Sequence, residues 1–339
     1  MKKKIVQVAH VTKIPGPVQT LAEFIEKNEN NNLKKIYFEL NDGKIWKYVE
    51  DFWKTFWKIK KEKRIDLAIG MNCFDSLPLV LLRKDRIKKV IFFGTDFSRQ
   101  RFRNKLINFI YVMIDRYCAL KADFVCCNSQ RTIRQRVKEG LSKRKIIYTP
   151  NGVFLDKIKL ETKKIDSRKL VYIGHVSKEH GLEGLIKVVK KSGLNLDIVG
   201  NGPNFRYLKK KYSNSQIRFL GERSHNEVLE YLINFGGFGV APYTSGVSDW
   251  TYYCDPVKIK EYLACLVPVI ISDVPEVAKN IEKNGFGFVY KNNKELGMVL
   301  EKIKKIDNKT YLEKVKKIKK VRKNFDLNNI YLNIFNKLN

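Results

Sequence analysis

The sequence lacks an apolar run long enough to cross a bilayer. Its longest such run, Tyr262 to Ile271, has ten residues and contains Pro268, whereas a membrane-spanning helix needs about 20. The basic start, Met1 to His10, carries the charge of a secretory signal, but its apolar stretch is short and is interrupted by Gln7. We therefore expect a first strand at Ile5–Ala9 rather than a leader.

Cysteine and the common enzyme motifs are scarce as well. The six cysteines include an adjacent pair, Cys126 and Cys127, but no Cys-x-x-Cys spacing, which argues against a disulfide framework and a zinc cluster. The expected compartment is therefore the reducing cytoplasm. There is no P-loop, no Gly-x-Gly-x-x-Gly fingerprint and no nucleophile elbow around Ser129 or Ser177. No Asp-x-Asp pair is present to hold a divalent metal against phosphates, so we expect no metal site.

The chain does contain a regular alternation of short apolar runs and helical patterns. Its 339 residues favour two domains, and the alternation favours parallel α/β units. The predicted strands are Ile5–Ala9, Lys35–Phe38, Asp66–Ile69, Lys89–Phe93, Phe124–Cys127 and Lys145–Tyr148, then Leu170–Ile173, Leu196–Val199, Ile217–Leu220, Phe238–Ala241, Val269–Ile271 and Phe286–Tyr290.

A turn cluster at Thr149–Gly152 and a polar, lysine-rich stretch separate the two series of strands. We expect an N-terminal domain at 1–150, a linker at 151–168, a C-terminal domain at 169–322, and a final helix at 323–339 that packs back towards the N-terminal domain. The predicted fold class is α/β, with two Rossmann-like, doubly wound parallel-sheet domains facing a central cleft. Open sheets of this kind bind ligands at the carboxyl ends of their strands.

The net charge of +32 is the outlier in the composition. It fits a lysine-rich solvated surface, an anionic membrane surface or substrate, or nucleic acid, and net charge alone does not choose among them. The basic residues are scattered rather than striped and no recognition motif appears, so nucleic acid is the least favoured partner.

Half of the arginines lie in residues 99–144. There the segment Asp96-Phe-Ser-Arg-Gln-Arg-Phe-Arg103 opens a helical pattern that we predict over Arg101–Leu120. Basic and aromatic residues at a helix start suit a lipid headgroup interface. The aromatics are equally compatible with the core, with the arginines in solvent; they are Phe102, Phe109 and Tyr111.

Glycines follow several predicted strands where a helix begins. Gly16 follows the first strand, Gly174 ends the first strand of the second half, and Gly200 and Gly202 take the same place one unit later. Glycine there lets a ligand approach the backbone, and the helix start offers N–H groups to an anion. An ordinary turn explains Gly16 equally well.

The most specific local motif is Asp255-Pro-Val-Lys-Ile-Lys-Glu-Tyr-Leu-Ala-Cys-Leu-Val-Pro-Val-Ile270. Asp255 suits an N-cap and Pro256 the first helical position. Lys258 and Glu261 are three apart and share one helical face near the amino end. An ammonium there can meet phosphate and a carboxylate can accept two ribose hydroxyls. A capped surface helix with an ion pair is the alternative.

Taken together, these motifs resemble those of the GT-B glycosyltransferases of family 4. The resemblance covers almost the whole chain, and its most specific residues are Val171 to Leu182, Leu196 to Pro203, Ile217 to Gly221 and Asp255 to Ile270. It implies a nucleoside-diphosphate sugar donor in the second domain and an acceptor in the first. It also implies transfer with retention and without metal, and no cofactor beyond the nucleotide-sugar co-substrate.

One departure from the family concerns its acidic pair. The family commonly has two glutamates eight residues apart; Glu261 matches the second, which typically binds the ribose, whereas the first would fall at Tyr253. Asp255 or Asp249 then becomes the candidate for contact with the donor sugar.

The other departure concerns the diphosphate. The family commonly places Arg directly after the glycine and Lys five residues further; here these positions are His175 and His180, with Lys178 between them. A protonated imidazole can neutralise phosphate and a neutral one cannot. Alternatively, Lys178 and backbone N–H groups hold the phosphates and the histidines only pack.

In the first half the resemblance is looser. It implies that Asp96, after a strand end, orients or deprotonates an acceptor hydroxyl; the alternative is an N-cap of the arginine-rich helix. His10 is a lesser candidate. The cluster Arg99, Arg101 and Arg103 would face the acceptor and makes a glycan or a lipid-linked molecule plausible.

The sequence therefore predicts a hexosyltransferase-type enzyme (EC 2.4), cytoplasmic or peripheral on the inner face of the membrane. The rival hypothesis is a catalytically degenerate GT-B module that binds a glycan or a partner protein. The missing first glutamate and the two histidines favour this rival.

Overall fold

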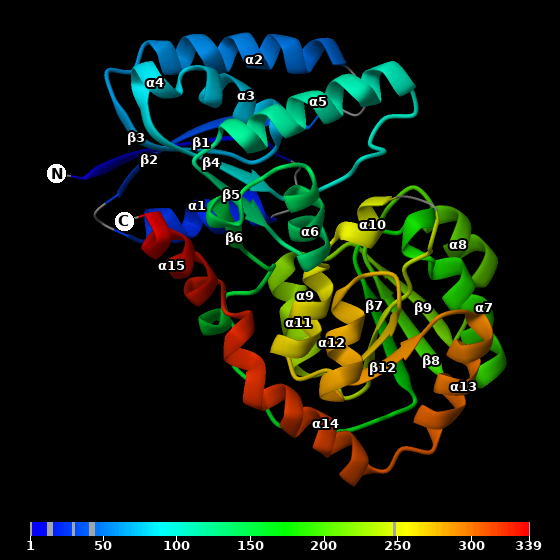
Figure 1. The fold of residues 1–339 in the computed structure, drawn as a ribbon. Coiled ribbons are helices and arrows are strands. Elements are labelled where there is room, and N and C mark those ends of the chain that lie inside the picture. The colour runs from blue at the N-terminus through cyan, green and yellow to red at the C-terminus, as the bar shows by residue number, and fades with distance from the viewer. Residues whose placement is uncertain (1, 12–15, 29–30, 41–44, 247–248, 339) are drawn as a thin grey trace. The chain divides into compact units, whose positions relative to one another are not determined.

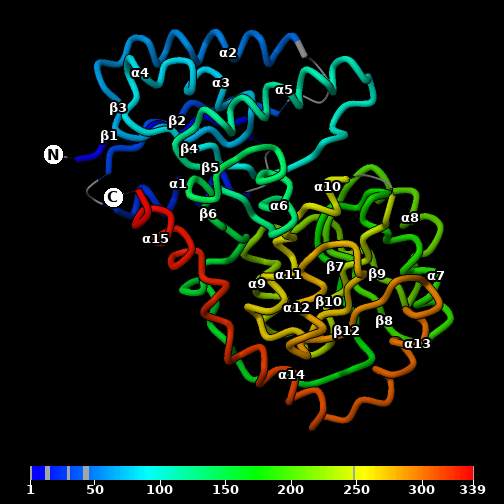
Figure 2. The backbone as a smooth tube through the Cα atoms, in the orientation of Figure 1, coloured from blue at the N-terminus to red at the C-terminus, as the bar shows by residue number. Residues whose placement is uncertain are grey.

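The computed structural model describes residues 2–11, 16–28, 31–40, 45–246 and 249–338 (Figure 1). The chain divides into two compact units, the first formed by Met1–Pro150 with Tyr331–Asn339 and the second by Asn151–Ile330. Figure 2 follows the same path as a tube. The last helix, α15 (Leu327–Leu338), begins in the second unit, and its residues from Tyr331 onward belong to the first unit.

The first unit is built on a parallel sheet with the strand order β2-β1-β3-β4-β5-β6 among the described residues. Each pair of neighbouring strands is parallel. The strands are β1 (Lys3–Val11), β2 (Asn31–Glu39), β3 (Ile65–Gly70), β4 (Ile87–Gly94), β5 (Phe124–Cys127) and β6 (Ile146–Tyr148).

Helices cover both faces of this sheet. Figure 1 shows α2, α3 and α5 on one side and α1 on the other, where the end of α15 also lies. Here the Tyr331 hydroxyl is hydrogen-bonded to the Thr20 hydroxyl at 2.7 Å, and its ring lies 5.4 Å from that of Phe24. The helices are α1 (Pro17–Glu26), α2 (Ile45–Lys60), α3 (Cys73–Leu81), α4 (Arg83–Arg86), α5 (Lys105–Lys121) and α6 (Gln130–Lys138).

The second unit repeats this plan around a parallel sheet of order β12-β11-β10-β7-β8-β9. Its strands are β7 (Lys169–Ile173), β8 (Asn195–Val199), β9 (Ile217–Gly221), β10 (Phe238–Ala241), β11 (Val269–Ser272) and β12 (Gly287–Tyr290). Its helices are α7 (Leu182–Ser192), α8 (Phe205–Tyr212), α9 (His225–Ile233), α10 (Asp249–Tyr253), α11 (Val257–Ala264), α12 (Val277–Asn284), α13 (Asn293–Lys304) and α14 (Asn308–Val321).

The central strands form where continuous apolar runs are buried on both faces of a sheet. In β7, Leu170 through Ile173 are all buried, and so are all four residues of β10 and β11. Two apolar clusters, one on each side, hold the second sheet between its helices. The predicted fold class of two doubly wound parallel sheets is confirmed.

Some local expectations were wrong. The helix predicted from Arg101 begins at Lys105, because the Asn104 side chain caps it by accepting the N–H groups of Leu106 and Ile107 at 3.0 and 3.1 Å. Asp96 is therefore not its N-cap. The short helix α10 was not predicted. The segment predicted as a linker places two buried side chains, Val153 and Ile158, in the core of the second unit, and its role as a linker stays a prediction.

Candidate functional site

Helix α11 is fixed in the second unit by one buried tyrosine. The Tyr262 hydroxyl accepts the N–H of Ile173 at 3.0 Å and lies 3.1 Å from the Val171 carbonyl oxygen, both in β7. Its ring packs directly on Gly239 of β10, where a Cβ would lie only 2.6 Å from the ring. This close fit against two strands sets the position of the helix face that carries Lys258 and Glu261.

Lys258 is a buried ammonium without a counter-ion in contact. Its Nζ has no hydrogen-bond partner among the residues that the structure describes, and it lies 4.3 Å and 5.4 Å from the ring centres of Tyr172 and Tyr243. Burial lowers the pKa of Lys258 to about 7, against the opposing effect of the Glu261 carboxylate. Because an unpaired buried charge is costly, an anion beside this side chain would reduce that cost. The predicted alternative of a Lys258–Glu261 ion pair does not form.

Gly174 opens the space beside this ammonium. It has φ +120°, and a Cβ built on it would lie 3.0 Å from the Lys258 Nζ. The glycine is exposed at the carboxyl end of β7. A side chain at position 174 would therefore crowd the ammonium on the open side of the strand end.

The glycines of the next loop serve packing between two loops. A Cβ at Gly202 would lie 2.6 Å from the Val176 carbonyl oxygen, and one at Gly200 would clash with the Gly174 carbonyl oxygen. The Val176 N–H donates to the Asn201 carbonyl at 2.9 Å. These glycines admit the neighbouring backbone, which carries Gly174; their predicted contact with a ligand stays a prediction.

The two histidines after β7 differ in environment. His175 is exposed, as is Lys178, whereas His180 is half-buried against Tyr243 and Trp250 with ring centres 5.5 and 5.6 Å away. Burial is the main cause that lowers the pKa of His180 to about 2, and the positive charge of Lys258 is the second. His180 is thus neutral in the free protein and supplies no charge for a diphosphate.

Glu261 has a partner that the sequence analysis missed. His225, the first residue of α9, places its Nδ1 3.2 Å from the Glu261 Oε1. This hydrogen bond raises the pKa of His225. The only sequence signal was the Ser224–Glu227 capping box, which locates the helix start but not its contact with α11.

Asp255 plays a structural role in the second unit. We expected it to be the N-cap of α11, but the cap residue is Pro256. The Asp255 carboxylate instead accepts the Asn151 N–H at 2.8 Å and pairs with Lys260 at 3.0 Å. Burial raises the pKa of Asp255 and Lys260 opposes that rise. Both carboxylate oxygens are engaged, so a sugar contact would require breaking these bonds.

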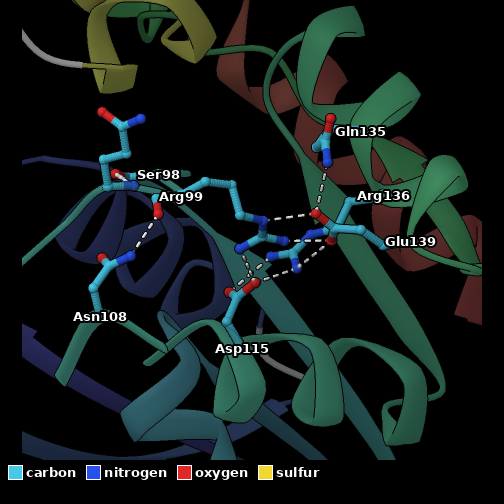
Figure 3. A network of polar contacts seen from close by, with 8 residues as sticks. Ser98, Arg99, Asn108, Asp115, Gln135, Arg136 and Glu139 are labelled. Atoms are coloured by element: carbon cyan, nitrogen blue, oxygen red, sulfur yellow. Dashed lines mark hydrogen bonds and ion pairs between the residues drawn. The ribbon is translucent and has the colours of Figure 1, made fainter. Parts of the chain in front are cut away.

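In the first unit, Arg99 is committed to a buried network (Figure 3). Its guanidinium bonds to Asp115 of α5 at 2.7 Å and, through Nε, to Glu139 at 2.6 Å. Arg136 of α6 shares Asp115 at 2.9 Å. The network ties α5 to α6, so Arg99 would have to leave these ion pairs to contact an acceptor, and its acceptor role stays a prediction.

The remaining predicted residues of the first unit are nearer to solvent. Asp96, Arg101 and Arg103 are exposed. Gly16 precedes α1, but its N–H donates to the Gln19 Oε1 at 2.9 Å and its φ of −151° suits any residue. The N–H of Gly16 itself is therefore already used, and a ligand contact at this turn stays a prediction.

His10 lies between two carboxylates. Its Nδ1 is 2.6 Å from Asp75 and its Nε2 is 3.4 Å from Asp51. The side chain is only 4% exposed, so this group is an internal triad.

In the described part of the chain, no helix is long and apolar enough to cross a membrane.

Comparison with known proteins places these features in a family context. Residues 170–332 match the family model described as Glucosyltransferase 3-like, C-terminal domain. No curated protein matches the sequence at a significant level.

Solved structures match over the whole chain. HepE from Anabaena, in complex with UDP and glucose, matches with a TM-score of 0.75 and 14% identity over 99% of both chains. Sucrose-phosphate synthase from Thermosynechococcus elongatus has a TM-score of 0.79 and 14% identity over 99% of this chain and 98% of that one. The lipopolysaccharide outer core galactosyltransferase WaaB has a TM-score of 0.68 and 14% identity over 99% and 98%.

The two sheets and these matches define a protein of the GT-B fold. The predicted resemblance to GT-B glycosyltransferases is confirmed over the whole chain at low identity. The range similar to the glucosyltransferase family contains Lys258, Glu261 and the glycine loops.

Proposed function

We propose that the chain is a glycosyltransferase that uses a nucleoside-diphosphate sugar, with UDP-glucose as the first candidate. The observation that carries the proposal is Lys258, a buried ammonium beside Gly174 at the carboxyl end of β7. HepE was solved with UDP-glucose, and the matching family model is described as glucosyltransferase 3-like. Both support a hexosyl donor.

In this proposal, each group near α11 has a separate task. Lys258 meets the diphosphate, joined by the exposed Lys178 and by N–H groups of the loop after β7. Glu261 holds the ribose hydroxyls, and His225 orients its carboxylate. His175 and His180 lie on the same loop, with ring centres 6.1 Å apart. His175 is the better candidate of the two for a phosphate contact because it is exposed.

The acceptor and the chemistry are also part of the proposal. Transfer would proceed with retention and without metal, and the departing phosphate would take the acceptor proton. Asp96 would position the acceptor hydroxyl, and Arg101 and Arg103 would face an anionic or lipid-linked acceptor. WaaB is a lipopolysaccharide outer core galactosyltransferase, which supports a lipid-linked acceptor.

A second candidate is a GT-B module that binds its ligand without transferring sugar. The neutral His180 and the tyrosine at position 253, where the family commonly has glutamate, favour it. This candidate would bind a glycan or a partner protein. The two candidates differ in turnover, which an assay of donor hydrolysis measures directly.

The test is thermal unfolding of the full chain with UDP, GDP and ADP and with their glucose conjugates. A ligand present at 100 times its Kd adds about 2.7 kcal/mol of stability, so we expect UDP and UDP-glucose to raise the Tm by several degrees. Glu261→Gln should reduce this rise, whereas Glu301→Gln, an exposed exchange in α13, should not.

Three outcomes decide the matter. A UDP-dependent rise with slow hydrolysis of UDP-glucose supports the enzyme. A rise without hydrolysis or transfer to any glycan supports the binding module. No rise with any nucleotide, and identical behaviour of the Glu261→Gln protein, would contradict the enzyme and leave only a module that binds a glycan or a partner protein.

A further inference from the structure

Helix α5 presents an apolar face to solvent. Six of its large apolar residues are between 39% and 68% exposed, and their spacing of three or four residues places them on one face of the helix. The opposite face carries the buried residues Tyr111, Asp115 and Cys118. The exposed residues are Leu106, Phe109, Ile110, Met113, Tyr117 and Leu120.

Helix α2 carries a second stripe of this kind. Trp46, Val49, Trp53 and Trp57 are all exposed, Trp46 by 84%. They recur at helical spacing opposite a buried row that includes Thr55 and Ile59. Three of the four tryptophans of the chain therefore stand on this one face.

The two stripes belong to the same side of the first unit. Helix α3 packs against both α2 and α5, and Figure 1 shows the three helices on one side of the sheet. A row of rings links them: Tyr48 of α2 lies 4.6 Å from Phe74 of α3, which lies 5.9 Å from Tyr111 of α5. Since the buried faces of both helices turn towards this shared layer, their exposed stripes face away from the sheet together.

Positive charge surrounds the stripes. Residues 47–64 contain seven Lys or Arg and three acidic residues. Of the acidic residues, Asp51 is buried and Glu50 pairs with Lys54 at 2.6 Å. In α5 the acidic residue is the buried Asp115. The Lys60 ammonium lies over the Trp57 ring, 4.8 Å from its centre, so a positive charge lies directly on the stripe.

We propose that this face of the first unit, the α2/α5 face, binds the surface of an anionic lipid bilayer. The combination of exposed tryptophans, long aliphatic side chains and flanking lysines suits a headgroup layer, where rings enter the acyl boundary and ammonium groups meet lipid phosphates. A neutral protein surface would satisfy the apolar stripes and leave the lysines without a partner of opposite charge. The inference goes beyond the proposed reaction and does not depend on it.

This surface differs from the one that the sequence indicated. The sequence pointed to the arginines from Arg99 to Arg103 with three aromatic residues. In the structure Arg99 is held in ion pairs, Tyr111 is buried and Phe102 packs against the core. Of those aromatic residues, Phe109 alone belongs to the exposed stripe.

The test is flotation of the full chain with phosphatidylcholine vesicles that either contain or lack phosphatidylglycerol. We expect recovery with the anionic vesicles only, and weaker binding as salt is raised. In a Trp250→Phe background all tryptophan emission comes from the α2 stripe, so it should shift to shorter wavelength on vesicle binding.

Paired variants locate the surface. Trp53→Ser with Trp57→Ser, and separately Phe109→Ser with Met113→Ser, should each weaken vesicle binding by about tenfold or more, because burial of each large apolar side chain is lost. The control pair, Tyr207→Ser with Met298→Ser, removes equally exposed residues of the second unit and should bind as the wild type does. The Tm of each variant and its response to UDP should stay unchanged.

Two results would overturn the proposal. One is that the α2 and α5 variants bind the anionic vesicles as well as the wild type and the control pair do. The other is sedimentation of the wild type as a dimer that the α2 and α5 variants abolish, with no vesicle binding; this would make the face an interface between two copies of the chain.

Discussion

At the scale of the residue, Lys258 combines a cost in stability with a use in binding. An ammonium without a counter-ion in contact destabilises the folded chain, and the cost shows in its pKa, lowered from 10.5 to about 7. Such perturbed groups concentrate at functional sites. A diphosphate that meets this ammonium would supply the missing charge, so binding should draw a proton onto Lys258 above neutral pH.

We predict that Lys258→Met stabilises the protein and removes nucleotide binding. Because the folded pKa lies below the unfolded one, the unfolded chain holds more protons between about pH 7 and about pH 10.5. Wild-type stability should therefore rise with pH across this window and the variant should lack that rise. In urea unfolding, the free energy of unfolding of the variant should exceed that of the wild type by on the order of 2 kcal/mol near pH 7. This difference should become smaller towards pH 9.

The same proton governs UDP affinity. In the wild type the Kd for UDP should be level below about pH 7 and increase above it, as the free protein loses the charge on Lys258. Lys178→Met, an exposed exchange on the nearby loop, is the control and should keep this pH dependence. A Lys258→Met protein that binds UDP as the wild type does would remove Lys258 from the site.

At the scale of the element, the two loops after β7 and β8 act as one layer. Gly200 has φ +135° and faces the Gly174 backbone. Gly193 also has a positive φ, +72°, but has open space around it.

We therefore predict that Gly200→Ala lowers the Tm more than Gly193→Ala does. Both exchanges strain the backbone by about 1 kcal/mol, but Gly200→Ala must also push the two loops apart. It should weaken UDP binding too, because Gly174 and the loop of His175 would move. Equal losses of stability in the two variants would show that the loops separate without cost.

The sequence predicted the strands better than the site. Strands β5 and β10 were predicted to the residue, because a strand buried on both faces is a continuous apolar run with turns at its ends. The helix α10 has five residues, too few for a periodic pattern to appear. The cap of α11 shifted because the carboxylate of Asp255 bonds to Asn151, more than 100 positions away in the chain.

Contacts between distant segments decided the rest of the site. Spacing alone put Lys258 and Glu261 on one helix face, which the structure bears out. Their partners are set by the tertiary fold: the rings of Tyr172 and Tyr243 around Lys258, and His225 beside Glu261. The burial that keeps His180 neutral likewise follows from packing and has no local signature in the sequence.

At the scale of the whole molecule, the charge balance is the dominant property. The 67 basic side chains exceed the 35 acidic ones by 32, so pairing every carboxylate would still leave this excess. Some carboxylates already serve two lysines, as Glu62 does with Lys4 and Lys34. Repulsion among the remaining cations works against the compact state.

We predict that salt stabilises this protein and weakens its vesicle binding. Between about 50 mM and about 500 mM NaCl the Debye length falls from roughly 14 Å to roughly 4 Å, so repulsion is screened and the Tm should rise by a few degrees. Tetramethylammonium chloride should act alike, since screening does not depend on the cation. A Tm that falls would mean that surface ion pairs outweigh the excess charge. Because the two effects have opposite signs, loss of vesicle binding in salt cannot be attributed to unfolding, and it would report directly on attraction between lysines and lipid phosphates.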